Sequence, residues 1–293
     1  MPMNSLIAFV RWYNHACPWN HYKRAMSRWA AERLGDADEP RICERVQGGL
    51  RMRLDLSNDA QKLTYLNHYE PVTLRLLRRI LRPGDVFVDG GANVGLLTLV
   101  AARCVGAQGS VYAFEPQPAA LARLEENVRL NDAGNVTIVP KCCWDEAGTN
   151  TLFTERGNSI GKVSMRQSAE AADTGATGAE PMVAETVRMD DVVDGPVRLI
   201  KLDVEGAELP ALRGARGLFE AAPPHLIVEL QCATAEPFGY HPMEIVDWVL
   251  ERGAYRLHLI ERKRHRPINR DALARLLDER PDKLRNLWCE PVG

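Results

Sequence analysis

The chain has 293 residues, of which 45% are hydrophobic and 26% charged, as is usual for a folded globular protein. This composition excludes a disordered, collagen-like or disulfide-scaffold protein. The formal net charge is −2, whereas a dedicated nucleic-acid-binding protein would carry a basic excess. The charge is unevenly distributed, however. Residues 1–34 hold five Lys/Arg against one acid, residues 252–285 hold eleven against five, and the segment between them is acidic.

The cysteine pattern bears on compartment and on metal binding. The seven cysteines are scattered, without a Cys-x-x-Cys pair, which favours reduced, mostly buried thiols in a cytoplasmic protein. No ligand quartet has the spacing of a zinc site, so no metal site is expected. No apolar run approaches the roughly 18 residues that span a bilayer, and no basic segment precedes the apolar N-terminus. We therefore expect neither a transmembrane segment nor a signal peptide.

The predicted elements begin with a helix over residues 19–34, whose aromatic residues recur at helical spacing. This helix is expected to pack on the domain or on a partner subunit in a homo-oligomer, and contact with a membrane surface stays open. Residues 41–56 alternate weakly and predict short strands or a hairpin. A further helix is predicted over 69–82, where Pro83-Gly84 ends it.

From residue 85 onward, short apolar runs alternate with segments of helical periodicity. We expect seven strands, at 85–89, 110–115, 136–140, 198–203, 225–231, 255–261 and 286–290, and helices at 95–104, 117–130, 206–220, 242–252 and 270–277. Such alternation is typical of βαβ units. It predicts an α/β fold with a doubly wound, mostly parallel, seven-stranded sheet.

One stretch interrupts this alternation, because residues 141–197 contain no pattern of a long helix. Residues 168–180 are small, polar and rich in glycine, which predicts a mobile loop at about 157–181. That loop is either a binding loop or a plain insertion. The expected organisation is a main domain over 65–293, preceded by a helical and short-strand extension over 1–64.

The strongest local motif is DGGANVG at residues 89–95, between a predicted strand and a predicted helix. In an open α/β sheet this turn lies where ligands bind. Glycines let the backbone approach a ligand, and the N–H groups of the helix favour an anion. Asp89 beside a helix N-terminus suits a ligand that carries both an ammonium group and a carboxylate. Glu115, at the next strand end, suits the two hydroxyls of a ribose.

Two further strand ends are acidic. The segment IKLDVEGAE places Asp203 and Glu205 in the turn after the strand at 198–203, and Glu229 ends the neighbouring strand. Carboxylates at this edge of the sheet are candidates for orienting or deprotonating a hydroxyl. The structural alternatives are acids that stabilise a helix N-terminus, for Glu205 and Glu208, and a salt bridge, for Glu229.

Together, VDGGANVG, FEPQP and IKLDVEGAE, in this order and spacing, resemble the FkbM-type methyltransferases over about residues 65–231. These are class I S-adenosylmethionine-dependent enzymes with a Rossmann-like fold. The resemblance implies S-adenosylmethionine as the cofactor and an acceptor side lined by Asn158 and Ser159. It also implies a set of residues that contact the cofactor: Glu70, Asp89, Gly91, Asn93, Gly95, Glu115, Pro116, Cys142, Cys143 and Asp203.

The implied reaction is O-methylation of a hydroxyl on a sugar, a glycan or a secondary metabolite. Asp203 or Glu229 is the candidate base, with Glu205 beside them, and assistance by a divalent cation is an alternative. A nucleic-acid methyltransferase is the competing enzyme, although the acidic turn at 203–205 would repel phosphate, so no nucleic-acid partner is expected. A catalytically inactive cofactor-binding assembly protein is the third hypothesis.

Overall fold

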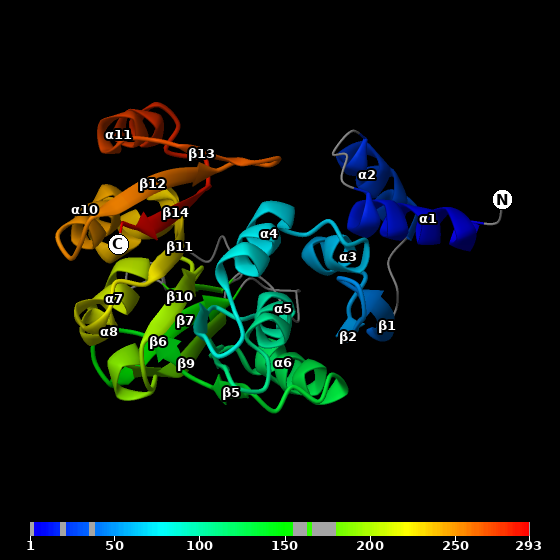
Figure 1. Ribbon diagram of the computed structural model, residues 1–293, viewed down its shortest axis with the longest axis horizontal. Coiled ribbons are helices and arrows are strands. Elements are labelled where there is room, and N and C mark those ends of the chain that lie inside the picture. Colours follow the sequence, from blue (N-terminus) through cyan, green and yellow to red (C-terminus); the bar gives the residue numbers. More distant parts are fainter. Residues whose placement is uncertain (1–2, 18–21, 35–38, 155–162, 166–179, 293) are drawn as a thin grey trace.

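The computed structural model of the protein describes residues 3–17, 22–34, 39–154, 163–165 and 180–292. Its centre is an eight-stranded sheet in the order β13-β12-β14-β11-β10-β3-β4-β5 (Figure 1). The strands, in chain order, are β3 (Val86–Gly90), β4 (Ser110–Phe114), β5 (Val136–Val139), β10 (Val197–Leu202), β11 (His225–Leu230), β12 (Tyr255–Ile260), β13 (His265–Pro267) and β14 (Arg285–Pro291). All seven predicted strands are present.

The prediction of seven strands in total was wrong, because β13 adds an eighth. The basic segment after Ile260 turns back on itself, and β13 pairs antiparallel with β12 at the edge of the sheet. A three-residue edge strand of sequence His-Arg-Pro has no alternating apolar pattern that would reveal it. The rest of the sheet follows the prediction. Six strands run in one direction, and only β13 and β14 oppose them.

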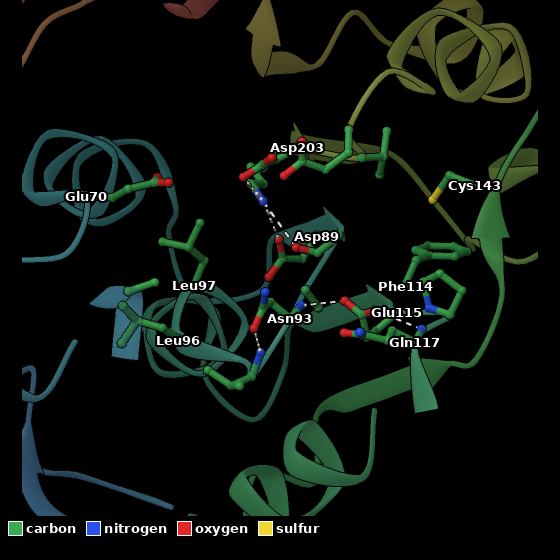
Figure 2. Close-up of a pocket in the computed structure, with 18 of the residues that line it drawn as sticks. Glu70, Asp89, Asn93, Leu96, Leu97, Phe114, Glu115, Gln117, Cys143 and Asp203 are labelled. Carbon is green, nitrogen blue, oxygen red and sulfur yellow. Dashed lines mark hydrogen bonds and ion pairs between the residues drawn. The ribbon is translucent and has the colours of Figure 1, made fainter. Parts of the chain in front are cut away.

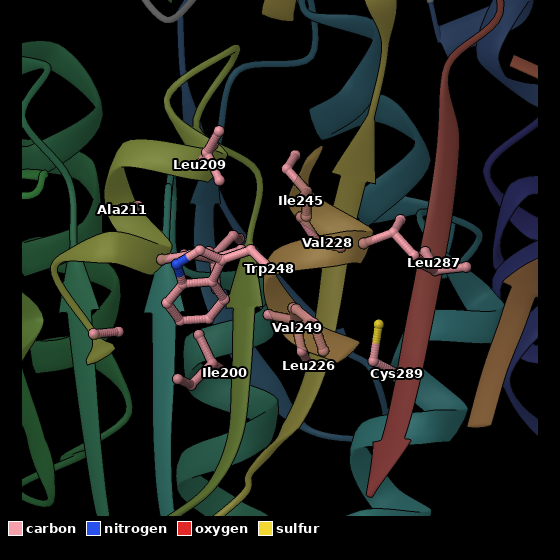
Figure 3. Close-up of a cluster of buried hydrophobic side chains, with 14 of the residues drawn as sticks. Ile200, Leu209, Ala211, Leu226, Val228, Ile245, Trp248, Val249, Leu287 and Cys289 are labelled. Atoms are coloured by element: carbon pink, nitrogen blue, oxygen red, sulfur yellow. The ribbon is translucent and has the colours of Figure 1, made fainter. Parts of the chain in front are cut away.

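Helices cover both faces of this sheet, as in a doubly wound fold. They are α4 (Pro71–Ile80), α5 (Leu96–Val105), α6 (Pro118–Leu130), α7 (Glu208–Arg213), α8 (Arg216–Ala221), α10 (Met243–Leu250) and α11 (Arg270–Glu279). Successive residues along a strand point to opposite faces of the sheet and therefore belong to different hydrophobic cores. Ile200 and Val228 pack against Trp248 of α10 (Figure 3), whereas Leu199 and Ile227 belong to the core shared with α4 and α5. This alternation is what the pleat of a buried strand requires.

The helix predicted over 206–220 is divided into α7 and α8. At Gly214, between the two helices, a Cβ atom would lie 1.8 Å from the carbonyl oxygen of Trp144, so the chain passes too close to a neighbouring segment for a side chain. Asp190 then accepts hydrogen bonds from the N–H groups of Gly217 and Leu218 (2.9 and 3.0 Å). These bonds satisfy donors at the start of α8 that a helix leaves unpaired.

A second, four-stranded sheet occupies the region where no long helix was predicted. It consists of β6 (Cys142–Cys143), β7 (Gly148–Thr154), β8 (Val163–Met165) and β9 (Glu180–Val187), in the order β6-β9-β7-β8. Short helices follow at η2 (Met189–Asp191), α9 (Cys232–Ala235) and η3 (Glu236–Phe238). Most of the loop predicted at about 157–181 lies outside the described residues, and so do Asn158 and Ser159.

The N-terminal segment contains α1 (Met3–Ala16), α2 (Lys23–Leu34), β1 (Arg41–Val46), β2 (Leu50–Leu54) and α3 (Asp59–Tyr65). The hairpin was predicted, whereas α1 and α3 were not, and α2 begins later than expected. Asn127 of α6 joins the hairpin to the main sheet, because it accepts from the Arg53 N–H (2.7 Å) and donates to the Val94 carbonyl (2.8 Å). No helix in the described part of the chain is long and apolar enough to cross a membrane. The domain boundary at residue 65 stays a prediction.

Candidate active site

A cavity of about 250 Å³ lies at the carboxyl ends of β3, β4 and β10. Residues of α3, of the segment just before α4, of the start of α5 and of the turns after these strands surround it (Figure 2). Its lining includes ten of the predicted site residues: Glu70, Asp89, Gly91, Asn93, Glu115, Pro116, Cys142, Cys143, Asp203 and Glu205. Gly95 and Glu229 are not part of the lining. The topology thus assembles these residues from five separate segments of the chain at one edge of the sheet.

The turn after β3 explains why the DGGANVG motif needs its particular residues. Gly91 has a φ of 78°, and a Cβ there would lie 2.0 Å from the Asp203 carbonyl oxygen. Only glycine therefore allows the turns after β3 and β10 to meet. Asn93 also has a left-handed φ, of 51°, and its side chain accepts from the Val94 N–H (2.8 Å). Gly95 has a packing role instead, since a Cβ there would lie 2.6 Å from the Leu124 side chain.

Glu115 is held rigidly at the end of β4. Its two carboxylate oxygens accept hydrogen bonds from the backbone N–H groups of Asn93 (2.7 Å) and Gln117 (2.9 Å). Burial raises the pKa of Glu115, and the two N–H groups partly oppose this shift. Each oxygen keeps a second lone pair. A fixed, buried carboxylate of this kind can accept hydrogen bonds from the hydroxyls of a ribose.

Lys201 of β10 lies at the centre of the acidic side of the cavity, and the sequence motifs gave it no role. Its Nζ is 3.3 Å from Asp203, 3.8 Å from Asp89 and 3.3 Å from the Gly91 carbonyl oxygen, to which it donates. Burial alone lowers the pKa of Lys201, but the carboxylates of Asp203, Asp89 and Glu70 outweigh it and hold that pKa above the usual value. A lysine within an otherwise apolar strand was the signal that could have revealed it.

The turn after β10 holds two acids with different tasks. Glu205 lines the cavity in a left-handed conformation, with a φ of 52°, which costs energy for a residue with a Cβ. Glu208 instead supports the turn: its carboxylate accepts from the N–H groups of Val204 (2.9 Å) and Gly206 (3.0 Å). Tyr240 donates to Glu208 as well (3.3 Å). These contacts agree with the structural alternative for Glu208, an acid that stabilises the N-terminus of a helix.

Glu229 is the second-last residue of β11 and is only 8% exposed. The described residues offer its carboxyl group no hydrogen bond or ion pair. Burial, together with Asp203, Glu205 and Glu208, raises the pKa of Glu229 to about 10. At neutral pH the group is therefore a carboxylic acid, which can donate a hydrogen bond but cannot accept a proton as a base.

Gln61 of α3 is a lining residue that sequence reasoning missed. Its Oε1 accepts from the Asp55 N–H (2.8 Å), which fixes the orientation of the amide. The other end, Nε2, is buried without a hydrogen-bond partner, and such an orphaned donor costs free energy unless a ligand satisfies it. The N-terminal extension thus contributes to the cavity wall, and no sequence motif marks this contribution.

The charges of the lining indicate which ligand the cavity suits. Glu70, Asp89, Asp203 and Glu205 surround a single buried cation, Lys201, so the site has an acidic excess. Oδ1 of Asp89 is buried without a hydrogen-bond partner. A ligand with an ammonium group, a sulfonium and a ribose would satisfy these acids together with Glu115. The residues therefore fit S-adenosylmethionine. Among the described residues, no group of three or more His, Cys, Asp or Glu side chains has the arrangement of a metal site.

The comparison with protein families agrees with this geometry. The family described as "Methyltransferase FkbM domain" matches residues 89–257, which is more than half of the chain. The chain belongs to this family. It is an S-adenosylmethionine-dependent methyltransferase, as the motifs predicted, and its sheet has the class I, Rossmann-like arrangement that the family resemblance implied.

Three curated relatives of this methyltransferase carry descriptive names. Methyltransferase sdnD of Sordaria araneosa is 32% identical over 55% of this chain and 70% of its own length. Hexuronic acid methyltransferase AglP of Haloferax volcanii is 29% identical over 64% of this chain and 72% of its own. The 31-O-demethyl-FK506 methyltransferase FkbM of Streptomyces tacrolimicus is 32% identical over 46% of this chain and 60% of its own. Two of these three names give an acceptor, a hexuronic acid and 31-O-demethyl-FK506, and these two acceptors differ chemically.

Proposed function

We propose that this methyltransferase transfers a methyl group to a hydroxyl oxygen of a sugar, a glycan or a secondary metabolite. Two of the relatives support this class of acceptor, since their names give a hexuronic acid and an oxygen of FK506. The observation that carries the proposal is the position of Asp203, which lines the cavity beside the residues that fit the cofactor. A hydroxyl needs a base when it attacks, whereas a neutral amine does not.

The residues divide the work as follows. When bound, S-adenosylmethionine supplies a methyl group on a positively charged sulfur. Glu115 would hold the ribose, and Glu70 and Asp89 would face the ammonium group. Asp203 would accept the proton of the acceptor hydroxyl as its oxygen bonds to the methyl carbon and the bond between that carbon and sulfur breaks. Its Oδ2 contacts Lys201, which leaves the other carboxylate oxygen for the acceptor.

Of the two candidate bases, we favour Asp203 over Glu229. The side chain of Asp203 is 25% exposed and lines the cavity, so an acceptor can reach it. Glu229 is protonated at neutral pH and lies outside the lining. Glu229 then acts as a hydrogen-bond donor toward Asp203 or Glu205, a role that a glutamine can preserve.

Isotope labelling tests this proposal across several classes of acceptor at once. The protein is incubated with ¹³C-methyl S-adenosylmethionine and a panel of hexuronic acids, neutral sugars and polyketide alcohols, and the products are examined by NMR. We expect an O–¹³CH₃ signal with one class, lost in Asp203→Asn and retained in Glu229→Gln. A label on nitrogen would contradict O-methylation, and full turnover by Asp203→Asn would contradict the choice of base.

A further inference from the structure

A row of arginines covers the solvent face of α4. Arg75, Arg78 and Arg79 are exposed, at helical spacings of three and four, whereas Leu74 and Leu77 are buried against the core. Residues 71–80 contain no acid. Residues with this spacing share one side of a helix, so α4 presents three guanidinium groups to solvent without an acidic neighbour of its own.

The β12–β13 hairpin extends this row. In its turn, the Lys263 carbonyl accepts from Arg75 Nη2 (2.9 Å), and at the start of β13 His265 Nε2 is 3.3 Å from Arg79 Nη1. Lys263 itself is exposed. Figure 1 shows the β12–β13 hairpin reaching over α4. We call Arg75, Arg78, Arg79 and Lys263 the α4 basic face.

These cations lack counter-ions. Within the described residues, no carboxylate lies within ion-pair distance of any member of the α4 basic face. Elsewhere on the surface, arginines such as Arg28 and Arg216 are paired with Glu32 and Glu220. The nearest acid of the hairpin, Glu261, is already bound to Arg266 (2.8 Å). Four positive charges without a paired carboxylate, from α4 and the β12–β13 turn, therefore gather on one surface, where they attract an anion.

The α4 basic face adjoins the active site. Glu70, which lines the cavity, immediately precedes α4, and Arg75 follows five residues later, which is about 7.5 Å along a helix. The cavity of about 250 Å³ is smaller than the roughly 300–1,000 Å³ typical of a site for one drug-sized ligand. We therefore expect the acceptor to extend beyond the cavity, onto the neighbouring surface.

We propose that the α4 basic face binds an oxyanion of the acceptor, so that the acceptor is an acidic molecule with a carboxylate or a phosphate remote from the methylated hydroxyl. This inference rests on the proposed function. The two ends of the acceptor then meet surfaces of opposite charge: the hydroxyl end enters the acidic cavity, and the anionic end stays on the basic surface. A nucleic acid fits less well, because its phosphates would also meet Asp203 and Glu205.

The test measures binding rather than turnover. Isothermal titration uses tetragalacturonic acid as the carboxylate probe, inorganic pyrophosphate as the phosphate probe and maltotetraose as the neutral control, each with the full chain and S-adenosylhomocysteine. The variant is Arg75→Gln with Lys263→Gln, and the matched control is Arg216→Gln, an arginine paired with Glu220. We expect one anionic probe to bind more weakly at higher salt, and about tenfold more weakly to the double variant, because charge-assisted contacts are lost.

The outcomes distinguish this inference from the proposed function. Equal binding of maltotetraose, an unchanged affinity of the double variant, or binding of neither anionic probe would overturn the inference. So would a preference for single-stranded RNA or anionic vesicles, assayed in parallel. S-adenosylhomocysteine should bind both variants as it binds the wild type. Failure of the wild type to bind S-adenosylhomocysteine would instead contradict cofactor binding, on which the proposed function depends.

Discussion

Lys201 and Asp89 face one another across adjacent parallel strands. The register pairs the two residues directly between β10 and β3, and Lys201 Nζ lies 3.8 Å from Asp89 Oδ1. Both are at least 95% buried. A buried ion pair is costly to form, but it is costlier to break, because the remaining charge stays without compensation. A change in the charge of Lys201 or Asp89 should therefore alter both the stability of the sheet and the electrostatics of the site.

The first prediction concerns the removal of this cation. Lys201→Met leaves the buried Asp89 and the partly exposed Asp203 without their shared cation, and we expect the free energy of unfolding to fall by about 3–5 kcal/mol. Urea denaturation measures the change. The double variant Lys201→Met with Asp89→Asn should recover part of the loss, because it removes one of the two uncompensated acids. An unchanged stability of the single variant would show that Lys201 does not compensate these carboxylates.

The second prediction separates strain from function at Glu205. The left-handed conformation of Glu205 costs about 1–2 kcal/mol for a residue with a Cβ, and glycine adopts it without that cost. Glu205→Gly should therefore be as stable as the wild type or slightly more stable, while it loses turnover. The matched control is Asp132→Gly, since Asp132 has a similar φ of 50° far from the site. Loss of stability with retained turnover at Glu205 would show that its role is structural.

The third prediction is a pH dependence caused by Glu229. Its pKa in the folded protein is about 10, whereas an unfolded glutamate has a pKa of about 4.3. Between these values the folded state binds one more proton, so this contribution to stability is complete below about pH 4.3 and declines as the pH rises. Glu229→Gln should remove that decline. The stability of the wild type relative to the variant should then fall from pH 5 to pH 9.

Urea unfolding midpoints at pH 5, 7 and 9 test this prediction. The difference between the two proteins should change by at most about 1.4 kcal/mol per pH unit. Glu220→Gln, at an exposed glutamate paired with Arg216, serves as the control and should show no comparable trend. A constant difference between the wild type and Glu229→Gln would mean that Glu229 titrates in an ordinary range and is again a candidate base.

The sequence predicted the strand ends well, because a buried strand followed by an acid or a glycine is a local pattern. Asp89, Glu115 and Asp203 could therefore be placed at one edge of the sheet from the sequence alone. Lys201 was not assigned a role, since two of its three partners, Asp89 and Gly91, lie over 100 residues away in the chain. Gln61 could not be found, because its position depends on how α3 folds over the cavity. The α4 basic face likewise exists only after the β12–β13 hairpin, nearly 200 residues away in the chain, folds against α4.

The last prediction concerns Gln61, whose Nε2 is buried without a partner beside the cavity. We expect this amide to donate to the carboxylate of the methionine part of the cofactor. Gln61→Glu keeps the acceptor for the Asp55 N–H but replaces the donor with a negative charge. The variant should bind S-adenosylhomocysteine at least about tenfold more weakly, and it should bind the decarboxylated analogue no more weakly than the wild type does.

Gln117→Glu, the same change elsewhere in the lining, is the control and should weaken the binding of both ligands equally. Equal losses for both ligands in Gln61→Glu would contradict the assignment.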